Sequence, residues 1–362
     1  MKILHIHPSM TSGGIEAMIS ALANEMAKKE DVTVCSIFKP TSNDIFWSRL
    51  TPCVKKITLG KMKSGFSIST IFKIFNTIRT GHFDVVNMHG MFYYYVLPVL
   101  LFHKKIKFFY TVHSDAKKEN TSWDKKLFFV KKYCFVKGFI HPITISKTSQ
   151  KSFSDLYQCS SKLIFNGVIK PELTNDDLLQ GYRLTEKTKI FIHVGRISTP
   201  KNQLVLCKVF KRLIDEGNDV VLLIVGAKQM ENIFQNIKPY FCERIVYLGE
   251  RNDILQLMAH CDAMCLPSIW EGLPITLIEA LSVGCIPICS SVGGIPDVIL
   301  DGENGLLSKS CSEEDFFFTV KRYLSLTDKQ CKYIICNCLK SFSKYNIRNT
   351  AEEYLKYYDY FK

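Results

Sequence analysis

The stretch AMCLPSIWEGLPITLIEALSVGCIPIC, residues 263–289, decides the fold. Its apolar run at 263–266 predicts a buried strand, and the pattern that starts with a proline at 274–283 predicts a helix. The apolar run at 287–289 predicts a second strand. A strand, a helix and a strand in this order build a parallel sheet, in which ligands bind beyond the carboxyl ends of the strands. The loop that joins the first strand to the helix is therefore a candidate site.

The same alternation extends over nearly the whole chain and indicates an α/β protein. In the first half, strands are expected at 2–7, 32–36, 84–89, 107–112, 142–145 and 162–165, with one helix whose apolar stripe runs from Ile15 to Met26. In the second half, further strands are expected at 190–194, 220–225 and 245–248, and helices at 203–216, 254–260 and 296–300. Helical segments are expected through 321–340 and 350–360.

This pattern predicts two doubly wound, Rossmann-like domains that face each other across a cleft. They are residues 1–169 and residues 170–344, and the polar stretch 170–189 is expected to link them. A C-terminal helix at about 345–362 is expected to pack back on the first domain.

Basic residues are concentrated in the N-terminal half. Residues 1–170 hold 25 Lys and Arg against 10 Asp and Glu, whereas the remainder holds 22 against 24. Such a surface attracts anionic lipid, nucleic acid or acidic substrates, although a charge run is also the ordinary solvated face of a domain. The longest uncharged apolar run, 91–102, is shorter than the roughly 18 residues of a spanning helix, so we expect a buried helix there. The lysine clusters comprise Lys104, Lys105, Lys107, Lys117, Lys118, Lys125, Lys126, Lys131, Lys132 and Lys137.

The 14 cysteines do not indicate a disulfide framework. Most of them lie in apolar runs, where a free cysteine behaves as a small hydrophobe. No Cys-x-x-Cys pair occurs, so a structural zinc site is not expected. The N-terminal run 1–7 is a strand interrupted by histidines and lacks the apolar core of a signal peptide. We therefore expect a cytoplasmic protein with reduced thiols.

Polar residues follow several predicted strands, where this fold places its ligands. Gly13 and Gly14 open the first helix, whose N-terminus favours an anion, although a tight turn without a ligand is an equal alternative. His113 ends the fourth predicted strand and is either a ligand contact or a structural histidine. Arg196 and Lys201 lie in one loop between a strand and a helix and suit a diphosphate, unless they are surface charges.

Two glutamates, Glu271 and Glu279, lie in the loop and the helix of the opening stretch. Glu279 falls in an apolar segment and so needs a hydrogen-bonding partner, for which a ribose diol is one candidate. The backbone N–H groups of Leu273 and of residues near Thr276 face whatever binds above the start of the helix.

Together these motifs resemble the retaining glycosyltransferases of family 4 over essentially the whole chain, and this resemblance implies the two-domain GT-B fold. Asp297 departs from the family pattern, in which Glu is common. The motifs that carry the resemblance are Gly13-Gly14-Ile15-Glu16, Asn166-Gly167-Val168, Val194-Gly195-Arg196 with Lys201-Asn202, the pair Glu271 and Glu279, Gly293-Gly294-Ile295-Pro296-Asp297, and Asn304-Gly305-Leu306-Leu307.

The resemblance implies a role for each candidate residue. The implied catalytic residues are Arg196, Lys201, Glu271 and His113, of which the two cations would also hold the donor diphosphate, Glu271 would contact the donor sugar or the phosphates, and His113 would contact the transferred sugar. The other implied donor contacts are Gly13 and Gly14 at the diphosphate, Glu279 at the ribose, Glu250 and Ile254 at the base, and Gly272, Leu273, Thr276 and Leu277 around the helix start.

The resemblance also implies the reaction. A sugar would pass from a nucleotide-sugar donor, with UDP favoured, to a lipid-linked or oligosaccharide acceptor in O-antigen, capsule or exopolysaccharide synthesis. No Asp-x-Asp motif occurs, so the cations and helix N-termini are expected to stabilise the leaving diphosphate without a metal or another cofactor. The basic first domain would meet an anionic membrane as a peripheral protein, and the aromatic run 92–95 lines the acceptor side or belongs to the core.

Two other classes of function stay open. A nucleotide-sugar epimerase or a phosphorylase could use the same fold, although the pairs Arg196 with Lys201 and Glu271 with Glu279 argue against both. A nucleic-acid-binding or scaffold protein could use the basic half of the chain. No zinc finger, RNP motif or arginine-rich run is present, so no nucleic-acid partner is expected.

Overall fold

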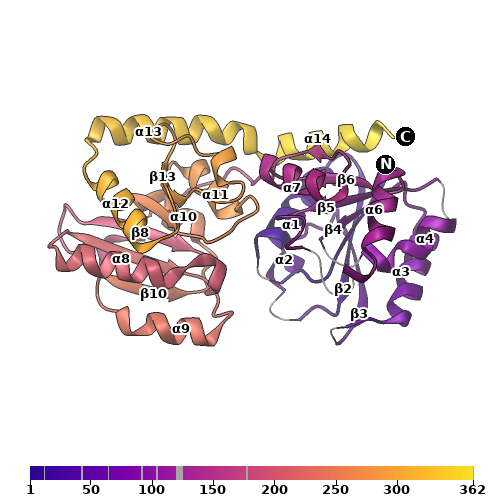
Figure 1. Cartoon of the computed structure of the whole chain (residues 1–362), viewed down its shortest axis with the longest axis horizontal. Helices are drawn as coiled ribbons and strands as arrows, with labels where there is room; N and C mark the ends of the chain where they lie inside the picture. Colours follow the sequence, from indigo (N-terminus) through magenta and orange to yellow (C-terminus); the bar gives the residue numbers. More distant parts are fainter. Residues whose placement is uncertain are drawn as a thin grey trace. The chain divides into compact units, whose positions relative to one another are not determined.

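The computed structural model divides into two units that are described separately below. Unit 1 comprises Met1–Ile169 and Tyr345–Lys362, and unit 2 comprises Lys170–Lys344. Figure 1 labels most of the helices and strands of both. The residues that the structure describes are 1–11, 13–41, 44–63, 65–90, 93–102, 105–119, 125–176 and 178–361.

Unit 1 is built on a seven-stranded parallel sheet in the order β3-β2-β1-β4-β5-β6-β7. Its inner strands are apolar and buried because helices cover both faces of a parallel sheet. The strands are β1 (Lys2–His7), β2 (Asp31–Phe38), β3 (Lys55–Lys61), β4 (Val85–His89), β5 (Lys107–Val112), β6 (His141–Thr144) and β7 (Lys162–Leu163).

The helices of unit 1 include the C-terminal one, which packs on the first. Helix α1 turns Met18, Leu22 and Met26 inward, as its apolar stripe predicts. Tyr358, in the last helix, accepts a hydrogen bond of 2.8 Å from the buried amide of Asn87 on β4. The helices are α1 (Gly14–Met26), α2 (Ile45–Ser48), α3 (Ile68–Gly81), α4 (Leu97–Phe102), α6 (Phe128–Val136), α7 (Lys147–Tyr157) and α14 (Ile347–Asp359).

Unit 2 is built on a six-stranded parallel sheet in the order β10-β9-β8-β11-β12-β13. Its strands are β8 (Lys189–Val194), β9 (Val220–Val225), β10 (Ile245–Gly249), β11 (Ala263–Leu266), β12 (Ile286–Ser290) and β13 (Leu306–Ser308). Its helices are α8 (Gln203–Asp215), α9 (Glu231–Ile237), α10 (Ile254–His260), α11 (Ile275–Val283), α12 (Glu313–Leu324) and α13 (Asp328–Phe342).

Both sheets follow the Rossmann strand order, so each has one point where the order reverses. That point lies between β1 and β4 in unit 1 and between β8 and β11 in unit 2. The predicted α/β class and the two parallel sheets are thus confirmed. The point of reversal is the switch point of the sheet. Ligands of such sheets bind there, outside the carboxyl ends of the strands.

Several boundaries differ from the sequence-based expectations. The edge strand β3 was not expected, because its lysines are exposed and it lacks a continuous apolar run. The helical segments expected through 321–340 are present as parts of two helices, because Thr327 caps a new helix and separates α12 from α13. The helix expected at 296–300 is a single 3₁₀ turn, Ile295–Asp297, and the predicted linker holds Leu179, which is fully buried within unit 2.

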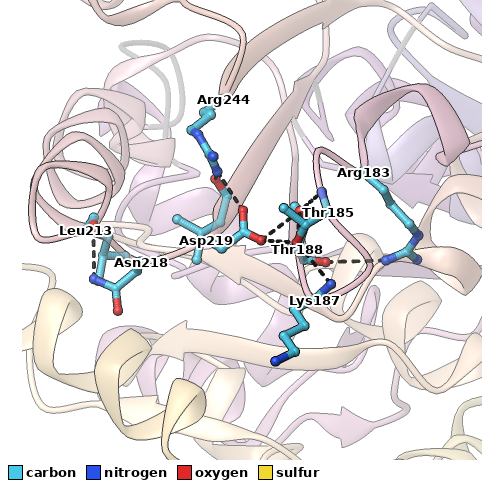
Figure 2. A network of polar contacts seen from close by, with 9 residues as sticks. Arg183, Thr185, Lys187, Thr188, Leu213, Asn218, Asp219 and Arg244 are labelled. Atoms are coloured by element: carbon cyan, nitrogen blue, oxygen red, sulfur yellow. Dashed lines mark hydrogen bonds and ion pairs between the residues drawn. The ribbon is translucent and has the colours of Figure 1, made fainter.

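Asp219 organises the end of the unit 2 sheet opposite its switch point (Figure 2). The residue precedes β9, and its carboxylate accepts hydrogen bonds from Thr185 Oγ1 at 2.5 Å, Thr188 Oγ1 at 3.0 Å and Arg244 Nη1 at 2.8 Å. These bonds, with Arg244 contributing the most, hold the pKa of Asp219 below its usual range. The network ties the segment before β8 to the strands beside it.

Candidate functional site

The switch point of unit 2 brings together three charged residues that the sequence analysis singled out. Arg196 follows β8, Lys201 ends a short 3₁₀ turn, Thr199–Lys201, and Glu271 lies in the loop after β11. Lys201 Nζ lies 2.7 Å from Glu271 Oε1, although 70 residues separate them. The register of β8 beside β11 produces this pairing.

Arg196 is held by its backbone and exposes its side chain. Gln203 Nε2, fully buried at the start of α8, donates to the Arg196 carbonyl at 2.9 Å. Gly226 allows the close approach of β9, since a Cβ there would lie 2.1 Å from the carbonyl oxygen of Gly195. In the part of the chain that the structure describes, no carboxylate pairs with the Arg196 guanidinium, so this cation is available to an anionic ligand.

The Glu271 loop is fixed from two sides. Ser268 Oγ donates to Glu271 Oε1 at 2.7 Å, and the carboxylate is mostly buried, with 11% of the side chain exposed. The N–H of Gly294 donates to Gly272 O at 2.7 Å. Gly293 has φ +56°, and a Cβ there would lie 1.9 Å from the carbonyl oxygen of Glu271. A glycine at position 293 is therefore required for this loop to pack.

Helix α11 begins directly after this loop and supplies the remaining candidates. Its N-cap residue, Pro274, provides no side-chain cap, so the first N–H groups of the helix point outward. Thr276 lies in the first turn, and its buried Oγ1 has no hydrogen-bond partner among the described residues. A helix N-terminus beside an unsatisfied hydroxyl is an arrangement that a phosphate or another anion completes.

The other candidates on α11 and just before it differ in how far their side chains are buried. Glu279 is half-buried one turn beyond Thr276, where a ligand can reach it. Leu273 and Leu277 are buried in the core, at 4% and 0% exposure. The N–H of Leu277 donates to Pro274 O at 3.2 Å, so Leu277 shapes the core of the helix rather than offering a donor.

Glu250 directly follows the edge strand β10, and Ile254 is the first residue of α10. Both therefore lie beyond the carboxyl end of β10, at the same end of the sheet as Arg196. Glu250 is exposed, and Ile254 opens α10 with its side chain half-buried. The N–H of Gly226 donates to Gly249 O at 2.8 Å, which joins this edge to the Gly195 loop. An exposed polar group beside a half-buried apolar one is compatible with the flat ring and polar rim of a nucleobase.

The switch point of unit 1 differs in chemistry. Gly13 and Gly14 open α1, which has no side-chain cap among the described residues, and Glu16 occupies its first turn. His113 directly follows β5, with only 5% of its surface exposed. The structure joins it to three histidines that the sequence analysis did not select: His5, His7 and His89. The only sequence signal was that His5 and His7 interrupt an otherwise apolar first strand, and nothing in the sequence marked His89.

The aromatic run 92–95 and the lysine clusters are only partly placed as expected. Of the aromatic run 92–95, Tyr94 and Tyr95 are buried in the core, whereas residue 92 lies outside the described part. Lys131, counted above among the surface lysines, is 2% exposed and lies 4.6 Å over the ring of Tyr110, and Lys104 lies outside the described residues. The basic surface of unit 1 therefore excludes Lys131.

The described residues show neither a metal cluster nor a disulfide. Among the residues that the structure describes, no group of three or more His, Cys, Asp and Glu side chains is placed to hold a metal ion. All fourteen cysteines are free. No helix within the described ranges is both long and apolar enough to cross a bilayer.

Comparison with known families accounts for almost the whole chain. The family described as Glycosyltransferase Family 4 matches residues 12–169, and the family described as Glycosyl transferases group 1 matches residues 175–338. The first match falls in unit 1 and the second in unit 2.

Individual relatives align over parts of the chain. N-acetyl-alpha-D-glucosaminyl L-malate synthase of Bacillus anthracis is 31% identical, over 36% of this chain and 34% of its own length. UDP-Gal:alpha-D-GlcNAc-diphosphoundecaprenol alpha-1,3-galactosyltransferase of Escherichia coli is 29% identical, over 48% of this chain and 49% of its own length. The chain thus spans between a third and a half of these two curated relatives.

A solved structure matches the complete fold. Anabaena HepE in complex with UDP and glucose aligns over 99% of both chains with a TM-score of 0.81 and 19% sequence identity. At that identity the likeness establishes the fold, which is the two-domain GT-B arrangement of Rossmann-like sheets.

Proposed function

Because this chain belongs to glycosyltransferase family 4, we propose that it is a retaining glycosyltransferase that moves a sugar from a nucleotide-sugar donor to a glycan acceptor. The observation that carries the proposal is the set of cations and donors at the switch point of unit 2. Arg196, the Lys201–Glu271 pair and the start of α11 with the unsatisfied Thr276 hydroxyl gather at one edge of the sheet.

These groups suit the departure of a nucleoside diphosphate. In the reaction, the bond between the sugar C1 and the diphosphate oxygen breaks, and negative charge grows on that oxygen. Arg196, Lys201 and the α11 N-terminus would stabilise this charge. The acceptor hydroxyl would form the new bond to C1 on the face that the diphosphate leaves, and its proton would pass to the departing phosphate oxygen. Glu271 would hold Lys201 in place through the 2.7 Å ion pair.

We propose a UDP-sugar as the donor, with Glu279 on the ribose hydroxyls and the Glu250 and Ile254 edge at the base. The fold match to a UDP-bound protein and the UDP-galactose named for the Escherichia coli relative support this choice. The acceptor is proposed to be a lipid-linked or oligosaccharide intermediate of O-antigen, capsule or exopolysaccharide synthesis. The diphosphoundecaprenol acceptor named for that relative supports it.

The first test is ligand-induced thermal stabilisation with UDP, GDP, ADP and their common sugar conjugates, with a chelator present. A ligand at one hundred times its Kd stabilises the native state by about 2.7 kcal/mol. We expect one nucleotide series to raise the Tm of the wild type and of Glu243→Ala, an exposed control, but not that of Glu279→Ala. If no nucleotide or nucleotide sugar raises the Tm of the wild type, the proposed donor is wrong.

We also propose that unit 1 attaches peripherally to an anionic membrane, on the cytoplasmic face. Helix α6 supports this because it exposes apolar side chains on one face, while Cys134 and Phe135 pack into the core. Phe129, Tyr133 and Val136, spaced four and three residues apart, are 82%, 55% and 52% exposed, whereas Lys131 on the same helix is buried. A helix that exposes aromatic residues and is flanked by lysines suits the headgroup region of a bilayer. The exposed flanking lysines are Lys125, Lys126 and Lys137.

Vesicle flotation tests the membrane proposal. We expect the wild type to float with vesicles that contain phosphatidylglycerol at low salt, to bind less at high salt, and to ignore pure phosphatidylcholine. The double variant Phe129→Ser/Tyr133→Ser should lose this binding. Phe318→Ser, on α12 of unit 2 and 58% exposed, is the matched control and should float as the wild type does. Equal flotation of the two variants would contradict a role for α6.

A further inference from the structure

Three buried histidines on neighbouring strands of unit 1 form one hydrogen-bonded chain. His5 lies on β1, His89 ends β4, and His113 follows β5. His5 Nδ1 lies 2.9 Å from His89 Nε2, and His89 Nδ1 lies 3.1 Å from His113 Nε2. None of the three side chains exposes more than 5% of its surface. The chain crosses the switch point of unit 1.

All three rings are neutral at ordinary pH. Burial lowers the pKa of His5 to about 4 and that of His113 to about 3. Burial and then the neighbouring imidazoles hold the pKa of His89 well below its usual range. Three neutral imidazoles carry three N–H hydrogens, and the two contacts between rings use two of them. The third hydrogen must therefore sit at one end of the chain.

Both ends of the chain are open. His5 Nε2 and His113 Nδ1 are buried and have no hydrogen-bond partner among the groups that the structure describes. If His5 donates toward His89, then His113 Nδ1 carries the third hydrogen. If His113 donates toward His89, then His113 Nδ1 presents a lone pair and His5 Nε2 carries the hydrogen. Shifting the hydrogens between rings interconverts these two forms without any change in net charge.

Ionisable side chains flank the three histidines on two sides. His7 Nδ1, on β1, donates to the His89 carbonyl at 3.0 Å, and its Nε2 lies 3.8 Å from Glu16 on α1. The carboxylate of Glu119 accepts a hydrogen bond from the backbone N–H of His113. Burial raises the pKa of Glu119 to about 7, against the opposing effect of the buried Lys131 on α6. Glu16 favours a charged His113, but burial outweighs it.

We propose that His5 and His89 are positioning residues, which let His113 Nδ1 present either an N–H or a lone pair to a hydroxyl of the bound sugar. A sugar hydroxyl both donates and accepts, so a nitrogen with either character matches it in whichever orientation the hydroxyl adopts. The inference rests on the proposed function, because it takes the ligand of His113 to be the transferred sugar. Beyond that function, it assigns a positioning role to His5 and His89.

If the three histidines served packing alone, their two end nitrogens would have hydrogen-bond partners. His193 of unit 2 gives that case: its Nδ1 donates to Cys265 O at 2.9 Å, and its Nε2 accepts from Gln203 at 3.2 Å. Its hydrogens are thereby fixed in one arrangement. In unit 1, two nitrogens lack partners among the residues that the structure describes, at a cost that folded proteins rarely accept, except where a ligand completes the site.

The first test is nitrogen NMR of the complete protein labelled with ¹⁵N-histidine, without any ligand. We expect three rings that stay neutral from pH 5.5 to 7.5 and that show scalar coupling across the two hydrogen bonds. Addition of the UDP-sugar that stabilises the protein should move the tautomer signals of His5 and His113 together. Independent titration of the three rings within that pH range would overturn the chain, whether or not a donor is found.

The second test is kinetic. His5→Leu fills the space but ends the chain, whereas the amide of His5→Asn can replace Nδ1 and keep the contact with His89. We expect His5→Leu to lower kcat by about 10–100-fold with little change in the donor KM, and His5→Asn to recover most of it. His141→Asn, at the opposite end of the sheet, should match the wild type. Equal activities of His5→Leu and His5→Asn would refute the positioning role, whereas a protein that binds no donor would refute the proposed function.

Discussion

A histidine on the first strand reaches across the switch point in both units. His7 donates to the carbonyl of His89 on β4, and His193 donates to the carbonyl of Cys265 on β11. Around the first contact, unit 1 gathers uncharged imidazoles whose end nitrogens are open. Around the second, unit 2 closes the histidine with Gln203 and places Lys201 against Glu271.

The difference shows how one backbone topology supports two kinds of chemistry. The strand order decides where loops converge, and the residues that follow each strand decide what can bind there. Unit 2 offers fixed positive charge, which suits a leaving diphosphate. Unit 1 offers neutral groups that can donate or accept, which suit hydroxyls. A substitution at the switch point of one unit should therefore change its chemistry and leave that of the other unit intact.

The largest expected effect comes from removing positive charge at the switch point of unit 2. Arg196→Ala and Lys201→Ala should each lower kcat by about 10²–10³-fold, or about 2.7–4 kcal/mol of transition-state stabilisation. Initial rates with the donor that stabilises the protein measure this. Lys211→Ala, which removes a cation from the exposed face of α8, is the control and should keep the rate. Losses of only a few fold would mean that unit 2 does not stabilise the leaving group by charge.

The next effect is acid sensitivity, which should differ between the units. Burial lowers the pKa of His5, His89, His113 and His141 in unit 1, but only that of His193 in unit 2 among the described histidines. Unfolded histidines bind protons below about pH 6.5. The folded His5, His113, His141 and His193 stay neutral until about pH 4 or lower, and burial shifts the pKa of His89 in the same direction, so stability is lost as the pH falls through that window. Each such histidine contributes about 1.4 kcal/mol per pH unit.

Hydrogen exchange of the intact protein at several pH values measures this difference. Glu119 works in the opposite direction, because its raised pKa makes the folded state bind its proton more readily, and so it offsets about one histidine. Protection of β4 in unit 1 should therefore fall from pH 6.5 to 4 more steeply than protection of β11 in unit 2. Equal slopes would mean that the histidines of unit 1 are not held neutral.

A smaller effect tests the glycines that hold the charged loops. Gly226→Ala should destabilise the protein by about 2 kcal/mol or more, because φ is +145° and the new Cβ would meet the Gly195 carbonyl oxygen at 2.1 Å. Gly217→Ala is the matched control: φ is +81° there, but nothing lies within 4 Å of the added Cβ, so only about 1 kcal/mol is expected. Urea unfolding of both variants measures the difference. Equal losses would show that backbone strain, rather than close packing on the Arg196 loop, accounts for the cost.

The sequence predicts the buried strands and the charged residues far better than it predicts the histidine chain. A strand such as β9 is a continuous apolar run because both of its faces are covered, and Arg196 and Lys201 stand out because they follow such a run. His5 and His89 are 84 residues apart, and only the pairing of β1 with β4 brings them together. Nothing local in the sequence marks two histidines as neighbours.

The same reasoning explains the other differences. Polar edge strands such as β3 lack the apolar signal, and the break between α12 and α13 depends on a capping box at Thr327 and Gln330 within a pattern that otherwise continues as a helix. The pair of Lys201 with Glu271 could be anticipated as charges near one edge, but not as a contact. Contacts between residues distant in the sequence depend on strand order and register, which periodicity alone does not specify.

The smallest effect separates the two ends of the unit 2 sheet. Asp219→Asn removes the charge that Arg244 pairs with at the end opposite the switch point, and should cost about 1 kcal/mol of stability because the amide still forms part of the network (Figure 2). The native contribution is present above the unfolded pKa and is lost as the pH falls through the lowered folded value, so the variant and the wild type should converge in acid. Denaturant unfolding at pH 7 and at low pH measures this. Nucleotide binding should stay unchanged, because the carboxylate lies at the amino end of β9 and the site lies at the carboxyl ends. A loss of binding larger than the loss of stability would mean that the network also positions the loops of the switch point.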